Sequence, residues 1–227
     1  MGRTVNPRRY DVAGRQRAAA DRRRRVLDAA VEIISAGGYV ATTMAHVAAA
    51  AGVSVEYLYK TFGDKPSLVR LLLDYVAGGD EKPVPVAQRP EVRQMKAEPD
   101  PRTVLAMYAR RCARVNARAA PLLLAMAAAA PGDARLAAVV RTAAQQRLGA
   151  AAAVVTDIES KGRLRCTPDE ARDTIWTLNA PEVWDLTVRR RGWSDERYAQ
   201  WIGRLMADEI LGSHPRRPEV TDRKGQH

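Results

Sequence analysis

Hydrophobic residues recur at the spacing of an α-helix along most of this chain. An apolar stripe over residues 21–35 is followed by Gly37-Gly38, a pair suited to end a helix. A second stripe extends from residue 65 to Gly78-Gly79 and has Pro66 in its first turn, where a missing N–H costs little. Little of the sequence alternates in the way that a half-buried strand does. The pattern therefore predicts an all-α fold.

Residues 43–62, with the sequence TMAHVAAAAGVSVEYLYKTF, predict two short helices joined by a sharp turn. Gly52 allows a positive φ in the turn without steric cost, and Ser54 is placed to cap the second helix. Leu58 and Phe62, four residues apart, form the buried face of that helix. This is the pattern of a helix-turn-helix, whose second helix, the recognition helix, lies in the major groove of DNA.

Further helical stripes follow in the second half of the chain. The strongest start signal is the capping box Thr167-Pro168-Asp169-Glu170, with Pro at the first helical position. The helices that we expect in this half cover residues 101–119, 121–130, 133–161, 167–179, 180–190 and 194–211. Pro121 is taken to separate the first two of them.

The organisation expected from these patterns has two folded domains. Residues 81–100 concentrate Gly, Pro and charge, as linkers do. We predict a basic, disordered arm (1–19), a helix-turn-helix DNA-binding domain (20–80), the linker (81–100), a larger helical effector-binding and dimerisation domain (101–212), and a disordered tail (213–227).

The charge of the chain favours a polyanionic partner. Its net charge is +11, and the first 25 residues hold nine Arg against two Asp. Most of the excess therefore lies beside the helix-turn-helix. An Arg-rich arm of this kind either enters the minor groove of DNA or serves only as a solubilising tail.

The remaining chemistry of the sequence is sparse. Cys112 and Cys166 lie in no metal-ligand spacing, and His46, His214 and His227 are too scattered for a zinc site. No nucleophile–base pair or phosphate-cradling glycine loop is visible, so we expect neither an enzyme nor a cofactor or metal. No apolar run reaches the ~20 residues of a membrane-spanning helix. We expect a soluble, cytoplasmic protein.

The N-terminal third resembles the DNA-binding domain of TetR/AcrR-type transcriptional repressors. The resemblance covers residues 20–80 and rests on the turn Ala51-Gly52-Val53-Ser54, the Leu58-Tyr59 pair, Phe62 and Asp64-Lys65. Residues 167–211 resemble, more loosely, the C-terminal part of actinobacterial-type members. The resemblance implies a homodimer that binds a palindromic operator and is released by a small-molecule effector. The helix after the recognition helix then transmits the signal.

The expected DNA contacts lie on and around the recognition helix. The family uses the tyrosine at the position of Tyr59 to contact a phosphate, although packing against the first helix is the alternative. Lys65 lies where an ammonium group and helix N–H groups both hold phosphate, or it is merely solvated. Glu56 either accepts from a cytosine amino group or repels wrong registers, and Thr43 contacts phosphate or only caps its helix. The complete set is Thr43, Val55, Glu56, Tyr57, Tyr59, Lys60, Thr61 and Lys65.

The second domain carries weaker signals. By resemblance, the effector pocket is lined by Met107, Tyr108, Cys112, Met126 and Trp176, although such a stripe also forms an ordinary core. Inward polar groups are scarce in this pattern, which favours a small apolar or aromatic effector. The candidate dimer interface contains Trp184, Trp201 and Leu205, because family members dimerise through their last two long helices.

These patterns together favour a double-stranded DNA operator and a second copy of the chain as partners, with no membrane. Three rival functions remain open at this point. The first is a regulator that responds to no effector, and the second is a regulator that activates transcription. The third is a protein that coats DNA without sequence preference.

Overall fold

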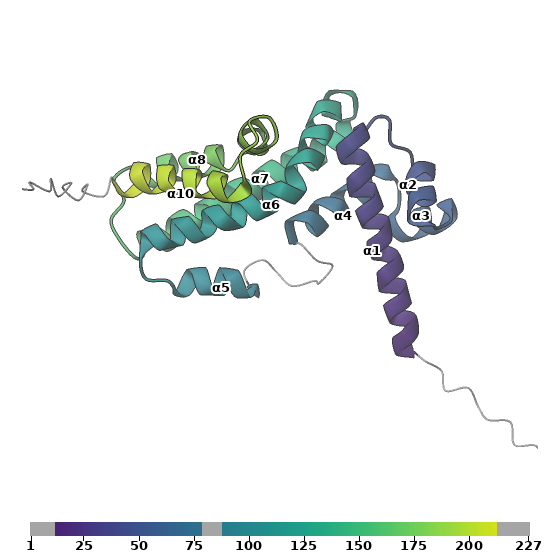
Figure 1. The fold of residues 1–227 in the computed structure, drawn as a ribbon, viewed down its shortest axis with the longest axis horizontal. Helices are drawn as coiled ribbons and strands as arrows, with labels where there is room; N and C mark the ends of the chain where they lie inside the picture. Colours follow the sequence, from purple (N-terminus) through teal and green to yellow (C-terminus); the bar gives the residue numbers. More distant parts are fainter. Residues whose placement is uncertain (1–11, 79–87, 213–227) are drawn as a thin grey trace, which may run out of the picture. The chain divides into compact units, whose positions relative to one another are not determined.

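The computed structural model describes residues 12–78 and 88–212, and every regular element in those ranges is helical (Figure 1). The all-α fold expected from the hydrophobic pattern is confirmed. The helices form two compact units, Met1–Val86 with Arg114–Gln146, and Ala87–Ala113 with Arg147–His227. Among the described helices, none is both long and apolar enough to cross a membrane. Residues 1–11 of the expected arm and the expected tail lie outside the described residues.

The first unit begins with the four N-terminal helices. They are α1 (Val12–Gly37), α2 (Met44–Ala51), α3 (Val55–Phe62) and α4 (Lys65–Gly78). Leu27, Ile34 and Leu58 are among the side chains that form their shared core. The prediction of disorder up to residue 19 was wrong for residues 12–19, which belong to α1. Ala and Arg have high helix propensity, and this explains a helix there without an apolar stripe.

Part of the first unit comes from far along the chain. Helices α6 (Pro101–Ala129) and α7 (Ala134–Glu159) are joined by a short 3₁₀ turn. Leu122, Met126 and Leu136, from the facing ends of these helices, join the core of α1 to α4. The expected break at Pro121 was wrong, since α6 continues through it. Neighbouring residues such as Ala120 and Leu122 are fully buried, which offsets the cost of about 3 kcal/mol of an internal proline.

The second unit contains the other ends of α6 and α7 and the remaining helices. These are α5 (Pro90–Ala97), α8 (Pro168–Leu178), α9 (Pro181–Trp184), a π-helical segment (Asp185–Arg189) and α10 (Asp195–Leu211). Helix α5 lies inside the stretch expected to be a linker, so that prediction was wrong for Pro90–Ala97. A Cβ at Gly203 would lie 3.1 Å from the Cβ of Ala109, so glycine allows α10 to approach α6 closely.

The capping box predicted at the start of α8 is present. The hydroxyl of Thr167 accepts from the backbone N–H of Glu170 at 3.3 Å, and the Glu170 carboxylate accepts from the backbone N–H of Thr167 at 2.8 Å. The two bonds satisfy N–H groups that a helix start otherwise leaves unpaired.

Candidate nucleic-acid interface

The turn before α3 is shaped by the two residues that the sequence singled out. Gly52 has φ +64°, a left-handed conformation that L side chains rarely adopt. The side chain of Ser54 accepts from the backbone N–H of Tyr57 at 3.1 Å and caps α3. Leu58 and Phe62 are buried, and this fixes the rotation of α3 against the core. The local rules therefore determine which face of α3 points outward.

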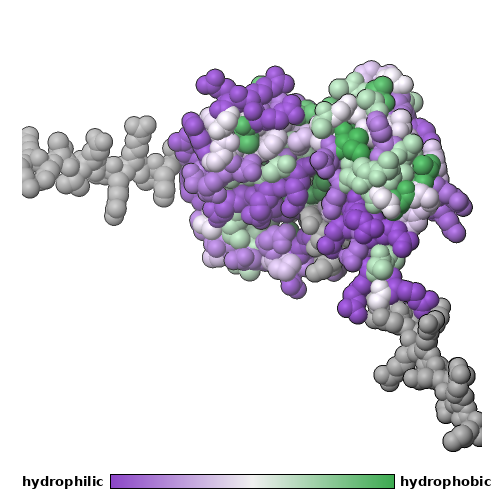
Figure 2. Space-filling model, turned by 45° about the vertical axis from the view of Figure 1, so that its right-hand side comes forward, coloured by the Kyte–Doolittle hydropathy of each residue, from purple (hydrophilic) through white to green (hydrophobic). Residues whose placement is uncertain are grey.

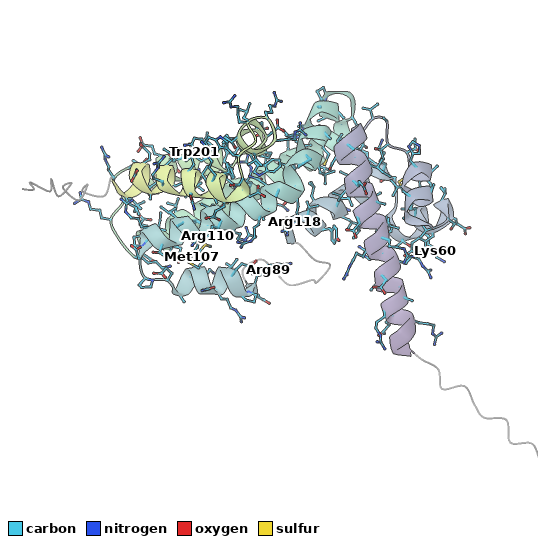
Figure 3. The ribbon with its side chains drawn as sticks, viewed as in Figure 1. Lys60, Arg89, Met107, Arg110, Arg118 and Trp201 are labelled. Atoms are coloured by element: carbon cyan, nitrogen blue, oxygen red, sulfur yellow. The ribbon has the colours of Figure 1, made fainter. Side chains whose placement is uncertain are left out.

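The outward face of α3 carries most of the expected DNA contacts. Tyr59 is 53% exposed and Val55 is 39% exposed, although both are large and largely apolar. The other exposed side chains of this face are Glu56, Lys60 and Thr61. Figure 3 shows Lys60 among the side chains that project from α3. Exposed aromatic and polar groups on a short, capped helix are suited to contact a nucleic acid.

Tyr57 differs from its expected outward orientation. It is half-buried, and its ring centroid lies 6.5 Å from that of Phe62 in an edge-to-face arrangement. The guanidinium carbon of Arg22, on α1, lies 5.5 Å from the centre of the Tyr57 ring. Arg23 lies in the same way over Phe62, at 4.9 Å. These stacking contacts join the basic part of α1 to the recognition helix.

The N-terminal part of α1 is a strongly basic helix. Between Gly14 and Arg25 it carries six Arg and one Asp. Apart from half-buried Gly14 and Arg23, its side chains from Gly14 to Arg25 are exposed. In Figure 2 hydrophilic residues gather where the chain enters this helix, beside the grey N-terminal trace. This basic segment therefore meets α3 through Arg22 and Arg23, whose guanidinium groups lie over rings of that helix.

Thr43 and Lys65 lie at helix starts, as the sequence predicted. The hydroxyl of exposed Thr43 accepts from the backbone N–H of His46 at 3.1 Å and caps α2. Lys65, the first residue of α4, has its ammonium nitrogen 4.0 Å from the centre of the Tyr39 ring. Partial burial lowers the pKa of Lys65, and the nearby Asp133 carboxylate opposes that shift. Its charge is thus held against an aromatic face beside a helix N-terminus.

Lys65 belongs to a cluster that sequence patterns did not reveal, here called the Tyr39 clasp: Tyr39, Asp64, Lys65, Asp133 and Arg135. The hydroxyl of Tyr39 donates to Asp133 at 3.2 Å, and Arg135 is paired with Asp64. Asp64 also caps α4 by accepting from the backbone N–H of Ser67 at 3.1 Å. Asp133 caps α7 in the same way, accepting from Leu136 at 3.0 Å. The clasp thus ties together the starts of α4 and α7, both within the first unit.

The pKa values in the clasp follow from these contacts. Hydrogen bonds from Ser67 and Arg135 lower the pKa of Asp64 to about 2, so it is ionised at neutral pH. Burial, followed by the neighbouring charge of Asp133, raises the pKa of Tyr39 to about 12. The phenol of Tyr39 therefore stays protonated and can donate its hydrogen bond to Asp133.

Arg118, on α6, makes a further contact with α4. Its Nε donates to the carbonyl oxygen of Val76, in the last turn of α4, at 3.2 Å (Figure 3).

Comparison with known proteins agrees with this geometry. Residues 26–72 match the family described as "Bacterial regulatory proteins, tetR family". This part of the chain, which contains the helix-turn-helix, is similar to the DNA-binding domain of that family. No curated protein shows significant similarity to the chain. The matched residues extend from the buried part of α1 to Leu72 in α4 and therefore contain the whole helix-turn-helix.

Solved structures share the fold over most of the chain. A TetR-family regulator from Rhodococcus sp. has a TM-score of 0.65 at 18% identity, covering 84% of this chain and 98% of its own. FadR from Bacillus subtilis, in complex with stearoyl-CoA, has a TM-score of 0.63 at 18% identity, with the same coverages of 84% and 98%. AibR, in complex with isovaleryl coenzyme A and operator DNA, has a TM-score of 0.57 at 18% identity, covering 81% and 97%.

The residues expected to line an effector pocket fall in both units. Tyr108 and Cys112, on α6, are buried in the second unit, and Met107 beside them is half-buried (Figure 3). Trp176, on α8, is half-buried in the same unit. Met126 does not accompany them, because it belongs to the core of the first unit. A helical stripe in the sequence could not show that the two ends of α6 serve different cores.

An arginine that the sequence analysis missed lies among the residues of the second unit. Arg147, on α7, has its guanidinium carbon 4.6 Å from the centre of the Trp176 ring and donates to the Trp176 carbonyl oxygen at 2.5 Å. Burial lowers its pKa, while Glu182, Tyr108 and Cys112 act in the opposite direction. The sequence around Arg147 has no charge pattern or motif spacing that sets it apart from a surface arginine. Its position beside Trp176 is therefore visible only in the fold.

The candidate dimer residues differ in exposure. Trp184 is buried, and its indole N–H donates to Asp195 at 2.9 Å within the same chain. Trp201 and Leu205 lie half-buried on α10, and Trp201 packs edge-to-face against Trp193 with the ring centroids 5.5 Å apart (Figure 3). Only Trp201 and Leu205 therefore retain surface for contact with a second copy.

Proposed function

We propose that this TetR-family regulator represses transcription as a homodimer that binds a palindromic operator. The observation that carries the proposal is the exposed face of α3, where Tyr59 and its polar neighbours stand on a helix fixed by Ser54, Leu58 and Phe62. Two-fold symmetry of a dimer would place two such helices in successive major grooves. AibR, whose fold this chain shares, was solved with operator DNA. DNA binding, and no catalytic activity, is the proposed role.

The test is a titration with DNA from upstream of the protein's own gene, with random DNA of equal length as the control. We expect at least ~10³-fold tighter binding to the upstream DNA, centred on a palindrome. The double variant Tyr59→Phe/Lys65→Ala removes two expected phosphate contacts and should therefore lose the tight binding. A matched variant, Lys96→Ala, removes an exposed lysine of α5 and should leave binding unchanged. Equal affinity for both DNAs would instead support a non-specific DNA coater.

The dimer has its own test. Leu205→Glu places a charge on the half-buried outer side of α10. Sedimentation velocity should show a dimer for the wild type and a monomer for this variant. Leu186→Glu, at a position that is already 53% exposed, is the control and should remain dimeric. A wild type that sediments as a monomer bound to a single half-site would contradict the proposal.

The basic part of α1 extends the proposed DNA surface. Arg17 and Arg24 are seven residues apart, so they lie on one side of the helix, two turns from each other. Because this segment is helical, we propose that it contacts backbone phosphates instead of threading into the minor groove. Each neutralised phosphate contributes about 0.9 to the slope of log affinity against log salt. Arg17→Gln/Arg24→Gln should therefore lower that slope by about 2, whereas Arg163→Gln/Arg191→Gln, in the second unit, should not change it.

The proposal includes release from DNA by an effector bound in the second unit. Two structures with the same fold hold acyl-CoA thioesters, stearoyl-CoA in FadR and isovaleryl coenzyme A in AibR. A thioester with an apolar acyl chain agrees with the apolar effector expected from the sequence. An effector can act only if it prefers the geometry that does not fit the operator. The measurement is operator affinity with and without added acyl-CoA, which also separates a responsive regulator from one without effector.

A further inference from the structure

The second unit buries nitrogen donors that have no acceptor among the described residues. Two such atoms are Nε of Arg111, on α6, and the indole Nε1 of Trp176, on α8. Leaving a buried N–H unpaired costs about 1–3 kcal/mol, so such groups are uncommon in stable proteins. Arg111 lies on the same helix as Tyr108 and Cys112. The second unit therefore contains buried N–H groups that could bind an acceptor supplied by a ligand.

Arg147 adds positive charge to the same place. A guanidinium group has five N–H donors, and the Trp176 carbonyl oxygen takes one of them. Among the described residues, no carboxylate lies within ion-pair distance of Arg147. Glu182 is the carboxylate that influences its charge from further away. The aromatic face of Trp176 covers one side of the guanidinium at 4.6 Å. A half-buried cation is thus held by a ring and a carbonyl, without a counter-charge in contact.

The hydroxyl of Tyr108 completes the cluster. Burial raises the pKa of Tyr108 well above its ordinary value, so the phenol stays neutral. Its hydrogen bond with the Cys112 side chain also raises the pKa of Tyr108, while the charges of Arg111 and Arg147 lower it. The inner donor cluster is defined here as Tyr108, Arg111, Arg147 and Trp176. Its members come from α6, α7 and α8, and two of them are cations.

We propose that the inner donor cluster binds the carboxylate group of an otherwise apolar effector, with Arg147 as its counter-charge. A carboxylate has two coplanar oxygens that match the fork of a guanidinium, and its remaining lone pairs suit the N–H groups of Arg111 and Trp176. Met107 and Cys112 supply apolar and weakly polar surface beside it. This revises the effector expected from the sequence, where inward polar groups were thought scarce. The inference rests on the proposed effector response, but it replaces the thioester effector considered above with a free carboxylic acid.

A purely structural role of Arg147 explains less. Trp176 lies in the last turn of α8, so Arg147 satisfies a carbonyl group that the helix end leaves unpaired. That role uses one N–H and leaves Trp176 Nε1 and Arg111 Nε without partners. It also predicts no preference of the protein for charged over neutral ligands. The two roles therefore differ in a property that can be measured.

The experiment uses the full-length protein and ligands matched in length. Decanoate, decanol and decanoyl-CoA carry the same apolar chain and differ at the head, and phenylacetate against phenylethanol repeats the comparison for an aromatic body. Affinity is measured by calorimetry and by the quenching of tryptophan fluorescence. We expect at least one carboxylate to bind about 10-fold or more tightly than its alcohol. Equal binding of each acid and alcohol, or no binding of any probe at millimolar concentration, would overturn the proposal.

Variants of Arg147 locate the effect. Arg147→Met should abolish the preference for carboxylate, whereas Arg147→Lys, which keeps the charge and one donor to α8, should retain part of it. Arg141→Met, at an exposed position of the same helix, is the matched control and should keep the whole preference. Unchanged carboxylate affinity in Arg147→Met, checked as folded by circular dichroism, would refute the site. Tight binding of decanoyl-CoA alone, independent of Arg147, would refute it in favour of a thioester.

A parallel operator titration separates this inference from the function on which it rests. Carboxylate binding that depends on Arg147 without any change of operator affinity would confirm the site and refute its regulatory role. Loss of operator binding on adding the same acid would support both. A protein that binds no specific DNA but still prefers carboxylates through Arg147 would overturn the proposed repressor and leave the ligand site standing.

Discussion

The buried hydroxyl of Thr42, in the first compact unit, donates to the carbonyl oxygen of Gly38 at 2.8 Å. The buried indole N–H of Trp176, in the second, has no acceptor among the residues that the structure describes. Ser35 Oγ in the first unit is also buried without a partner among the described residues. Asp64 there is paired with Arg135, and half-buried Arg23 and Lys65 lie over aromatic rings. In the second unit, the half-buried charge of Arg147 has no carboxylate in contact.

Under the proposed function, the two units meet their partners in different places. A DNA-reading unit meets DNA on its outer surface, so its interior can be closed by its own residues. A ligand-binding unit must keep complementary groups inside, and those groups remain unsatisfied until the ligand arrives. The unpaired indole N–H of Trp176, beside the charge of Arg147, fits that role, whereas an isolated unpaired group such as Ser35 Oγ does not.

The largest effect that we expect is a loss of stability when the residues that α6 and α7 contribute to the core of the first unit are truncated. Leu122 is fully buried there, so Leu122→Ala should lower the free energy of unfolding by about 2–5 kcal/mol, measured in urea. Leu186→Ala removes the same atoms from a leucine that is 53% exposed in the second unit and should change stability by about 0.5 kcal/mol at most. A cost below about 1 kcal/mol at Leu122 would show that α6 is not part of the first core.

Glycine to alanine should act with opposite sign in the two units. Gly52 has φ +64°, where a Cβ costs about 1–2 kcal/mol, so Gly52→Ala should destabilise by that amount. Gly149 lies exposed in the interior of α7 with no atom within 4 Å of an added Cβ. Gly149→Ala should therefore stabilise by about 0.5–1 kcal/mol. Thermal unfolding measures both, and two shifts of the same sign would contradict the assignment of strain to Gly52.

Removing a helix cap should cost the same in each unit but change DNA binding in only one. Ser54 caps α3 and Thr167 caps α8, and in each case the hydroxyl oxygen accepts a hydrogen bond from a backbone N–H. Ser54→Ala and Thr167→Ala should each lower stability by about 1 kcal/mol. Operator affinity should fall only for Ser54→Ala, because α3 carries the proposed DNA contacts. A comparable loss of affinity in Thr167→Ala would show that the two units are coupled through α8.

The smallest effect is a dependence on acid pH. Asp64 takes up its proton near pH 4 when unfolded, but its pKa in the folded chain is lowered to about 2. The stability from its hydrogen bonds is therefore complete above about pH 4 and is lost as the pH falls towards 2. The melting temperature of the wild type should fall more steeply across this window than that of Asp64→Asn, which keeps a helix cap. Parallel curves would exclude a contribution from Asp64.

Much of the first unit could be predicted from local sequence rules. Ser54, Gly52 and the buried pair Leu58 and Phe62 each act within a few residues, so their roles are visible without the fold. The capping box at Thr167 was visible in the second unit for the same reason. The outward face of α3 was correct except for Tyr57, which is held inward by stacking with Phe62 and Arg22.

What the sequence could not show depends on residues far apart in the chain. The Tyr39 clasp joins Tyr39 to Asp133, 94 residues later, and no local pattern links the two. In the sequence Arg147 resembles an ordinary surface arginine, and only the fold shows that it contacts Trp176 on α8. Helix α5 was missed because its proline-rich surroundings suggest a linker, whereas its two buried residues, Val92 and Met95, gain their partners only through tertiary packing.

The distant origin of Leu122, Met126 and Leu136 has a consequence for the newly made chain. The helix-turn-helix ends at Phe62, so it emerges from the ribosome well before these three side chains do. Until they follow, its core lacks them. Chains grow at about 5–20 residues per second, so several seconds separate the two events. During synthesis the nascent segment therefore cannot reach its full stability until the start of α7 has emerged.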